Sequence, residues 1–250
     1  MIFGKGKKGT EGFVLDMKIL AVDSSAGPAS CAVYQAGKVL AGSYANTGLT
    51  HSQTLAPMIN DVLKNAAVDI REIDLFAVSA GPGSFTGVRI GVAAVKGMAL
   101  AGDKPCIGVS TLAAMARLVS GLPVDGLVCA AMDARRGQVY AALFETDGGK
   151  IRRVMEDTAL AVEDLKKRVE NHKKKVILIG DGAGLCYNAF GSKADTFLAP
   201  PHLRYQNAVG VAMEAEADPQ RAVSAERLMP IYLRLPQAER ELKRRLGQFD

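Results

Sequence analysis

An order of predicted elements occurs twice along the chain, and this repetition constrains the fold more than any other feature. In the first half, three short strands precede an amphipathic helix, a buried strand, a glycine-rich loop and an apolar helix. The second half repeats three strands, a helix, a strand, a glycine-containing loop and a short helix. Strands that alternate with helices favour a sheet with helical cover. The sequence therefore predicts two similar α/β units.

Hydrophobic periodicity predicts the helices and strands of the first half. The helix expected at 51–67 has apolar residues at i, i+3, i+4, i+7, i+8 and i+11, the pattern of one buried stripe, with Thr50 as its N-cap. In the apolar helix, Gly91 and Gly97 each cost about 1 kcal/mol relative to alanine, which indicates close packing on more than one side. The expected strands are 18–23, 30–34, 38–44, 75–79 and 106–109, and the expected helices are 51–67, 88–101 and 110–119 with Ser110 as a cap.

The second half has expected strands at 126–132, 138–144, 150–155 and 176–179, and a helix at 162–170. A duplicated unit of this order resembles the actin, Hsp70 and sugar-kinase fold, in which two ribonuclease H-like lobes of mixed sheet are flanked by helices. We expect a flexible leader at 1–16, an N-terminal lobe with the glycine loop at 17–119 and a C-terminal lobe at 120–250. The last helices of the chain could pack back on the first lobe.

The charge of the chain gives a weak indication of RNA binding. The net charge is +5 and the pI about 9.0, with basic runs at 166–175 and 239–245. Both runs also contain glutamate, which is typical of a solvent-exposed helix face. The chain has no tryptophan and only 6% aromatic residues, which argues against a stacking platform for single-stranded RNA. We favour solvated helix faces over direct RNA binding.

The remaining composition predicts a cytoplasmic protein without a membrane segment. Four cysteines are far apart in apolar runs and form no zinc pattern, so we expect buried free thiols in a reducing compartment. They are Cys31, Cys106, Cys129 and Cys186. No uninterrupted apolar stretch reaches the ~18–20 residues of a membrane helix, and the N-terminus has no hydrophobic signal region.

The segment AGPGSFTGVRIG at 80–91 is the most specific motif. A glycine-rich turn between a strand and a helix can present backbone N–H groups to an anion. It can equally well fix a sharp turn and let the helix dock closely on the sheet. The segment is no P-loop, because Val88 and Arg89 stand where lysine and serine or threonine are required, and it has no G-x-G-x-x-G spacing. Both interpretations stay open at this point.

Polar residues at two strand ends suggest a remnant nucleotide cleft. In actin-like proteins, a carboxylate and hydroxyls at the end of the first strand bind the metal and phosphates of ATP. Asp133 has the corresponding place in the second half, but Ala134, Arg135 and Arg136 replace the hydroxyls and glycines of a second phosphate loop. One phosphate loop of two would bind ATP poorly. The candidate cleft residues are Asp23, Ser24, Ser25, Gly81, Gly83, Ser84 and Asp133.

The chain offers no catalytic or metal-binding constellation. His51, His172 and His202 are too scattered for a metal site. Ser84, His51 and Asp23 could form a triad on paper, but no nucleophile elbow supports it. We predict no catalytic residue and no metal ligand.

Five blocks of sequence resemble the TsaB (YeaZ-type) family. They are MKILAVDSS at 17–25, THSQTLAPMI at 50–59, AGPGSFTGVRIGVA at 80–93, DARRGQVYAAL at 133–143 and PIYLR at 230–234. The glycine-loop block is the most specific of them. The resemblance implies an actin-like fold and a role in making N6-threonylcarbamoyladenosine (t6A) in tRNA. It also implies partners, namely the transferase TsaD, the ATPase TsaE and, through the complex, tRNA.

The resemblance further implies that this subunit is not the catalyst. TsaD, a paralogue, modifies the adenosine beside the anticodon with a metal held by an H-x-x-x-H pair. Here His51 matches the first histidine, but Leu55 stands four residues later. We expect that this subunit requires no cofactor of its own and that ATP or ADP can take part at the level of the complex. The family has also been described as glycoproteases, but this sequence offers neither a nucleophile with an oriented base nor a metal site for such an activity.

Two hypotheses of different classes therefore remain. In the first, the chain binds and activates TsaD through the helices near 51–67 and 86–101, and the isolated protein can pair with itself through the same surface. In the second, it is a stand-alone actin-like ATPase or small-molecule kinase, which the degenerate second loop disfavours. The predicted interface residues are His51, Leu55, Met58, Ile59, Val62, Val88, Val92 and Val95, although all could instead be core residues.

Overall fold

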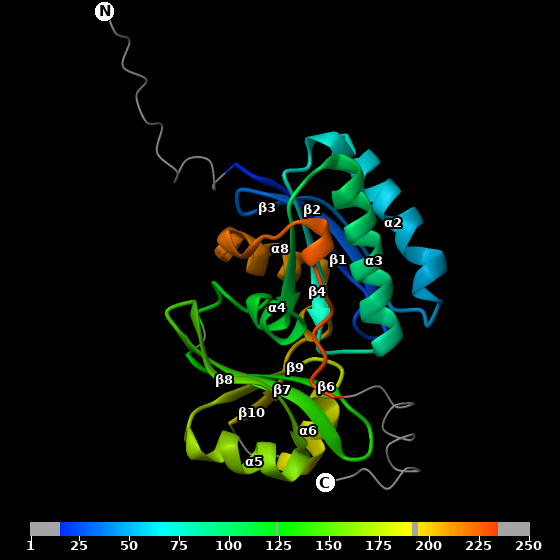
Figure 1. Ribbon diagram of the computed structural model, residues 1–250. Coiled ribbons are helices and arrows are strands. Elements are labelled where there is room, and N and C mark those ends of the chain that lie inside the picture. Colours follow the sequence, from blue (N-terminus) through cyan, green and yellow to red (C-terminus); the bar gives the residue numbers. More distant parts are fainter. Residues whose placement is uncertain (1–15, 124, 192–194, 235–250) are drawn as a thin grey trace, which may run out of the picture.

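The computed structural model describes residues 16–123, 125–191 and 195–234, arranged as two stacked lobes (Figure 1). Each lobe contains one five-stranded sheet. The leader expected at 1–16 lies outside the described residues apart from Asp16, whose backbone carbonyl accepts a hydrogen bond from the side-chain amide of Gln35.

The sheet of the N-terminal lobe has the strand order β3-β2-β1-β4-β5. The first three strands pair antiparallel, whereas β4 and β5 continue parallel to β1. Residues on β1 and β4 are buried almost without exception, as expected for central strands covered on both faces. The strands are β1 (Lys18–Asp23), β2 (Ala29–Gln35), β3 (Lys38–Ala45), β4 (Leu75–Gly81) and β5 (Cys106–Ser110).

The sheet of the C-terminal lobe has the same order when it is read from its other edge, β8-β7-β6-β9-β10. β6 takes the place of β1, with β7 antiparallel and β9 parallel to it. Two copies of this mixed topology make the duplicated, ribonuclease H-like, actin-like fold, so the fold prediction is confirmed. The strands are β6 (Gly126–Asp133), β7 (Gln138–Asp147), β8 (Lys150–Ala161), β9 (Val176–Ile179) and β10 (Thr196–Leu198).

Helices cover both faces of the first sheet. Helices α2 (His51–Ala66) and α3 (Phe85–Gly102) pack on the outer face, through a core that contains Leu20 and Phe76. Helix α8 (Ala208–Ala217) packs on the opposite face, against Ala21 and Ile107 among others. The chain thus returns from the second sheet to cover the first.

Helix α4 (Thr111–Arg117) lies between the two sheets, and six of its residues are buried. Helices α5 (Val162–Asn171) and α6 (Ala183–Phe190) cover the outer face of the second sheet. The two lobes therefore share a central apolar layer, while each has its own outer helix pair (Figure 1). The shorter elements are α7 (Pro201–Arg204), η1 (Ile70–Glu72), η2 (Pro219–Arg221) and η3 (Ala225–Arg227).

A helix cap explains the difference between the observed and the predicted start of α3. Helix α3 begins at Phe85, earlier than expected, because the Ser84 hydroxyl accepts a hydrogen bond from the Gly87 N–H. Ser110 caps α4 in the same way through the Ala113 N–H, as predicted. Thr50 occupies the N-cap position of α2, but its side chain makes no capping hydrogen bond. The elements from β10 to η3 were not predicted.

Candidate functional site

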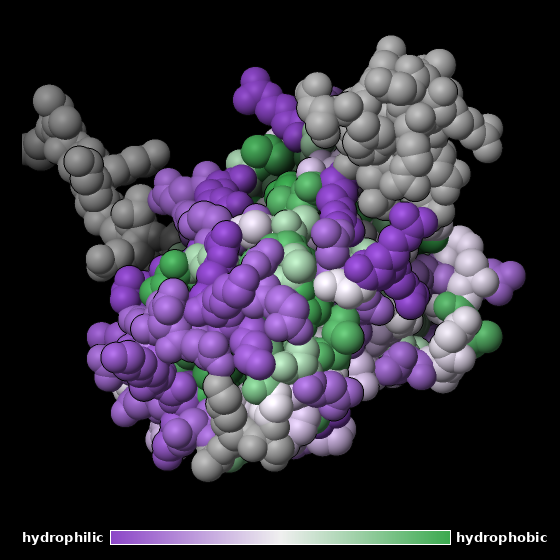
Figure 2. All heavy atoms as spheres, turned by 90° about the horizontal axis from the view of Figure 1, so that it is seen from below, coloured by the Kyte–Doolittle hydropathy of each residue, from purple (hydrophilic) through white to green (hydrophobic). Residues whose placement is uncertain are grey.

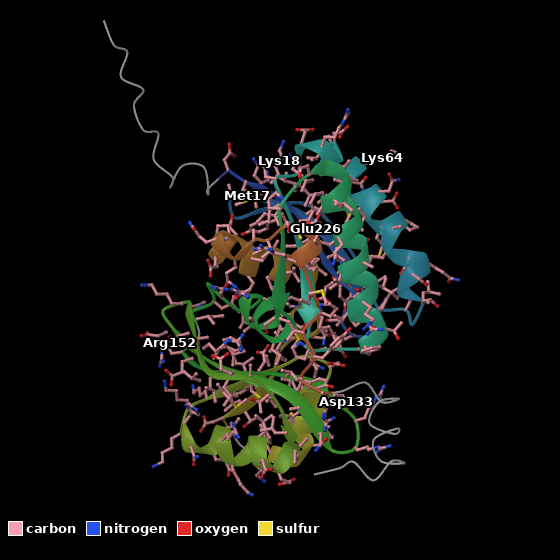
Figure 3. The ribbon with its side chains drawn as sticks, in the orientation of Figure 1. Met17, Lys18, Lys64, Asp133, Arg152 and Glu226 are labelled. Carbon is pink, nitrogen blue, oxygen red and sulfur yellow. The ribbon has the colours of Figure 1, made fainter. Side chains whose placement is uncertain are left out.

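A cleft of about 510 Å³ lies between the lobes, where the carboxyl ends of several strands meet. The turn after β1 and the glycine loop after β4 form its upper wall, and the ends of β6 and β9 form its lower wall. Figure 3 places Asp133 on the C-terminal lobe at this level of the molecule. The lining residues are Ser25, Ala26, Gly27, Pro82, Gly83, Ser84, Phe85, Met132, Asp133, Ala134, Arg135, Tyr140, Asp181, Ile231, Tyr232, Leu233 and Arg234.

Asp23 lies behind this wall instead of facing the cleft. Its side chain is 1% exposed, and burial raises the pKa of its carboxyl. One oxygen accepts hydrogen bonds from the backbone N–H of Ser25 at 2.9 Å and from the Ser25 hydroxyl at 2.7 Å. The other accepts a hydrogen bond from the Ser79 hydroxyl at 2.6 Å. Both oxygens are therefore engaged within the protein.

The glycines of the loop are explained by close packing. A Cβ at Gly83 would lie 2.3 Å from the Ser25 carbonyl oxygen, and one at Gly87 would lie 2.1 Å from that of Ser24. The Ser84 N–H also donates to the Ser25 carbonyl at 2.7 Å. These contacts are too short for any side chain, so α3 reaches its position on the sheet only with glycine at these sites. Of the two interpretations of the motif, these contacts support the one in which the glycines allow α3 to pack closely on the sheet.

The cleft does not fit a magnesium nucleotide in the manner of an actin-like enzyme. Asp23 is buried behind the wall of the cleft, and both its oxygens accept hydrogen bonds from protein groups. In the second lobe, Asp133 accepts a hydrogen bond from the Arg135 N–H at 2.7 Å and so closes its own turn. Arg135 and Arg136 both have positive φ, at 68° and 57°, in the hairpin where a second phosphate loop would lie. Among the described residues, no group of three histidine, cysteine or acidic side chains could hold a metal ion.

The predicted cleft residues divide into two groups. Ser25, Gly83, Ser84 and Asp133 line the cleft. Asp23, Ser24 and Gly81 lie behind them, and the Ser24 hydroxyl donates to the Gly87 carbonyl at 2.8 Å.

Sequence reasoning missed three parts of the lining, namely Tyr140, Asp181 and residues 231–234. Asp181 follows β9 directly after Gly180, the position that corresponds to the loop after β4, and this place in the repeat could have identified it. Burial raises the pKa of the Asp181 carboxyl, which accepts a hydrogen bond from the side-chain amide of the buried Gln206 at 2.9 Å.

The position of a TsaD-type histidine pair is occupied by structural residues. His51 contacts the Ala26 carbonyl oxygen through Nε2 at 2.7 Å and so supports the turn after β1. Leu55 is 2% exposed and belongs to the core of the N-terminal lobe. The side chain at position 55 therefore points toward the sheet, where it packs on apolar neighbours.

The predicted partner residues on α2 and α3 are corrected by the structure. Apart from the half-buried His51, they are all buried, and most belong to the core between these helices and the sheet. Side chains inside this core pack between the helices and the sheet and are not available for docking, with the exception of Ile59, which also lines the outer groove described below. The apolar stripe read from the sequence was the inner face of each helix. The buried residues are Leu55, Met58, Ile59, Val62, Val88, Val92 and Val95.

The outer side of the same helices nevertheless carries an apolar groove. It has a volume of about 760 Å³ and is formed mainly by small or apolar residues of both helices. A Cβ at Gly97 would meet no atom within 4 Å, so this glycine is not explained by packing inside the protein. The groove residues are Ala56, Ile59, Asn60, Leu63, Lys64, Val68, Asp69, Ile70, Ala93, Ala94, Gly97 and Met98.

Helix α3 exposes small and apolar residues on its outer side, among them Ala93, Gly97 and Leu100. Among the described helices, it is the one long and apolar enough to meet a length-and-composition test for a membrane span, although only 33% of that window is buried. Its buried stripe packs on β4 and β1, as in a core helix. The groove is also separate from the cleft, because Lys64 on its rim lies at the far end of the molecule from Asp133 (Figure 3). The outer face of α3 is therefore an exposed apolar surface of the N-terminal lobe that is distinct from the cleft.

The cysteines are buried free thiols, as predicted. Burial raises the pKa of the Cys31 and Cys186 thiols to about 12. Such thiols remain protonated near neutral pH and are poor nucleophiles.

Comparison with known proteins gives a consistent result. The family model for TsaD, the tRNA N6-adenosine threonylcarbamoyltransferase, matches residues 46–235. The tRNA threonylcarbamoyladenosine biosynthesis protein TsaB of Bacillus subtilis is 30% identical over 228 residues, which are 89% of this chain and 96% of that protein. TsaB of Escherichia coli is 36% identical over 167 residues, which are 66% of this chain and 72% of that protein. Among solved structures, YeaZ from Pseudomonas aeruginosa has a TM-score of 0.73 and 31% identity, covering 87% of this chain and 100% of that one.

Proposed function

The chain belongs to the TsaB family of tRNA threonylcarbamoyladenosine biosynthesis proteins, and on this premise we propose that it is a non-catalytic subunit that binds and activates the transferase TsaD. TsaD would then modify the adenosine beside the anticodon. The role in t6A biosynthesis follows from membership of the family, whereas activation of TsaD is the proposed step.

The observation that carries this proposal is the exposed groove between α2 and α3. A contiguous apolar groove open to solvent is the kind of surface that an interaction partner can cover. Ala93, Ala94 and Gly97 are small enough to let another helix approach closely. Leu63 and Met98 add larger apolar side chains to the same groove.

The chemistry of the partner follows from the family match. The TsaD model aligns with both α2 and α3, so a TsaD protein carries a corresponding helix pair. Two such pairs can pack face to face as a pseudo-symmetric four-helix bundle. A second copy of this chain could occupy the same groove in isolated protein, giving an isologous homodimer that competes with the heterodimer.

The geometry of the cleft supports a non-catalytic role. Asp23 is held by Ser25 and Ser79, and the equivalent of the second TsaD histidine is the buried Leu55. Among the described residues, the cleft presents no nucleophile paired with an oriented base and no group of three side chains that could hold a metal ion. These features disfavour the alternative of a stand-alone ATPase or kinase. ATP, TsaE and tRNA would then act at the level of the complex, in the cytoplasm.

Reconstituted tRNA modification tests the proposal. Purified TsaD and TsaE, a source of threonylcarbamoyl-adenylate, ATP and tRNA would be assayed for t6A formation with and without this chain. We expect little t6A without the chain, restoration by the wild-type protein and loss of restoration by Gly97→Glu, because the new carboxylate would be buried without a partner in the interface.

Gly184→Glu is the matched control. Gly184 lies on α6, the counterpart of α3 in the second lobe, and a Cβ there would also meet no atom within 4 Å. We expect this variant to restore t6A formation as well as the wild type. Full t6A formation in the absence of the chain would rule out the activating role. Equal activity of Gly97→Glu and wild type would move the docking surface to another face.

A further inference from the structure

Residues 231–234 cross the cleft between the lobes, and we propose that this segment, here called the clasp, is a device that ties the two lobes together and holds the cleft at a fixed opening. It belongs to the sequence block PIYLR, which the proposed docking through α2 and α3 does not explain. The inference is independent of the partner, because it concerns contacts within one chain.

One end of the clasp is anchored on the N-terminal lobe. The Ile231 N–H donates to the Ala80 carbonyl at 2.7 Å, next to the glycine loop. Gly81 has a φ of 128°, and a Cβ there would lie 2.2 Å from the Ile231 carbonyl oxygen. This glycine is therefore required by the clasp itself, in contrast to Gly83 and Gly87, which are required by the turn after β1.

The second anchor on this lobe is aromatic. The rings of Phe85 and Tyr232 lie 5.0 Å apart between centroids. The Arg89 guanidinium stacks over Phe85 at 3.8 Å and donates through Nε to the Tyr232 hydroxyl at 2.8 Å. A cation over an aromatic ring and a charge-assisted hydrogen bond both add to the anchoring free energy.

The other end of the clasp is anchored on the C-terminal lobe. Arg234 donates through Nη1 to the Ala134 carbonyl at 3.1 Å and lies 5.8 Å from the ring centroid of Tyr140. Ala134 begins the hairpin after β6, and Tyr140 lies on β7. Within the segment of residues 231–234, the chain thus passes from one wall of the cleft to the other.

The opposite side of the lobe junction is fixed by other contacts. The Ser110 hydroxyl, at the end of β5, donates to the Asp157 carboxylate of β8 at 2.6 Å, and Asp157 also pairs with Arg153. Helix α4 fills the space between the sheets with buried side chains. Among the described residues, α4 between the sheets and the clasp across the cleft thus both connect the two lobes. A fixed cleft suits a scaffold, whereas enzymes that close on a substrate need mobile lobes.

Hydrogen–deuterium exchange of the full chain tests the clasp by its coupling between lobes. Arg89→Ala removes an anchor on the N-terminal lobe, and we expect faster exchange of backbone amides 134–140 on the C-terminal lobe. Conversely, Arg234→Ala should accelerate exchange of the backbone amides of residues 83–89. We expect increases of about tenfold, which correspond to a loss of ~1.4 kcal/mol of contact free energy. A purely local role would change exchange only beside the substituted residue.

Two further variants complete the test. Met229 is 65% exposed and precedes the clasp, so Met229→Ala should leave exchange in both lobes unchanged. Tyr232→Phe removes only the hydroxyl that accepts from Arg89 and should give the same pattern with a smaller amplitude; it serves as the test if Arg89→Ala does not fold. Increases confined to the substituted lobe, or to residues 229–234 alone, would overturn the proposal.

Discussion

The two outer helix pairs cover equivalent faces of equivalent sheets, yet they present different surfaces. Helix α3 has 18 residues and exposes Ala93, Gly97 and Leu100, whereas its counterpart α6 has only 8 residues. Beside α6, helix α5 exposes mainly charged side chains. Hydrophilic residues cover much of the surface at this end of the molecule (Figure 2). Covering such a sheet therefore does not require the apolar outer face of α3, and this excess is what we assign to a partner.

The largest effect on stability should come from placing a charge on the buried face of α3 instead of on its exposed face. Val92 is 3% exposed in the core, so Val92→Glu would bury an unpaired carboxylate and cost ~3–5 kcal/mol of unfolding free energy. Gly97→Glu, five residues later on the open face, should leave the unfolding free energy equal to or above that of the wild type, because glycine is a poor helix former. Urea denaturation followed by circular dichroism measures both. Similar destabilisation by the two variants would contradict the division of α3 into a core face and an open face.

Substitution of the α3 glycines by alanine should have smaller effects on stability, with opposite signs at Gly87 and Gly97. A methyl group at Gly87 would lie 2.1 Å from the Ser24 carbonyl oxygen, so Gly87→Ala should destabilise the protein by ~1–3 kcal/mol. Gly97→Ala meets open space and should stabilise the isolated chain by up to ~1 kcal/mol. Thermal and urea unfolding of the pair would give the signs. A stabilising Gly87→Ala would remove the packing explanation of the loop.

The smallest effect is expected on α5. Lys167 pairs with Asp164 at 3.2 Å, but both side chains are more than half exposed, and such surface pairs contribute ~0–1 kcal/mol. Lys167→Ala should therefore change the unfolding free energy by less than about 0.5 kcal/mol. It should also leave TsaD binding unchanged. A large loss of TsaD binding in this variant would show that the partner surface lies on helices α5 and α6, and not on α2 and α3.

The sequence predicted the duplicated topology because the element order and hydrophobic periodicity are local properties of each half. It also predicted α2 and α3 as helices that each carry an apolar stripe. It did not distinguish their faces, because a stripe of Leu55, Val62 and Val92 has the same period whether it meets a sheet or a partner. The open groove combines small residues such as Ala93 and Gly97 with Leu63, and hydrophobicity alone does not separate these residues from the core.

Long-range contacts account for the other gaps. The role of Gly83 and Gly87 depends on Ser24 and Ser25, about 60 residues away in the chain, so the motif alone left two interpretations open. The cleft lining from residues 231–234 joins the glycine loop only after the chain has passed through the second lobe. No local pattern indicates such a contact.

The most direct test of the central claim is the dissociation constant for TsaD, measured by isothermal titration calorimetry with wild type, Gly97→Glu and the control Gly184→Glu. The account predicts that Gly97→Glu weakens binding at least ~100-fold, the equivalent of ~3 kcal/mol for an unpaired buried charge, while the control binds as the wild type does. The Gly97→Glu protein should at the same time be fully folded in the free state. A folded Gly97→Glu protein that binds TsaD with unchanged affinity would contradict the claim.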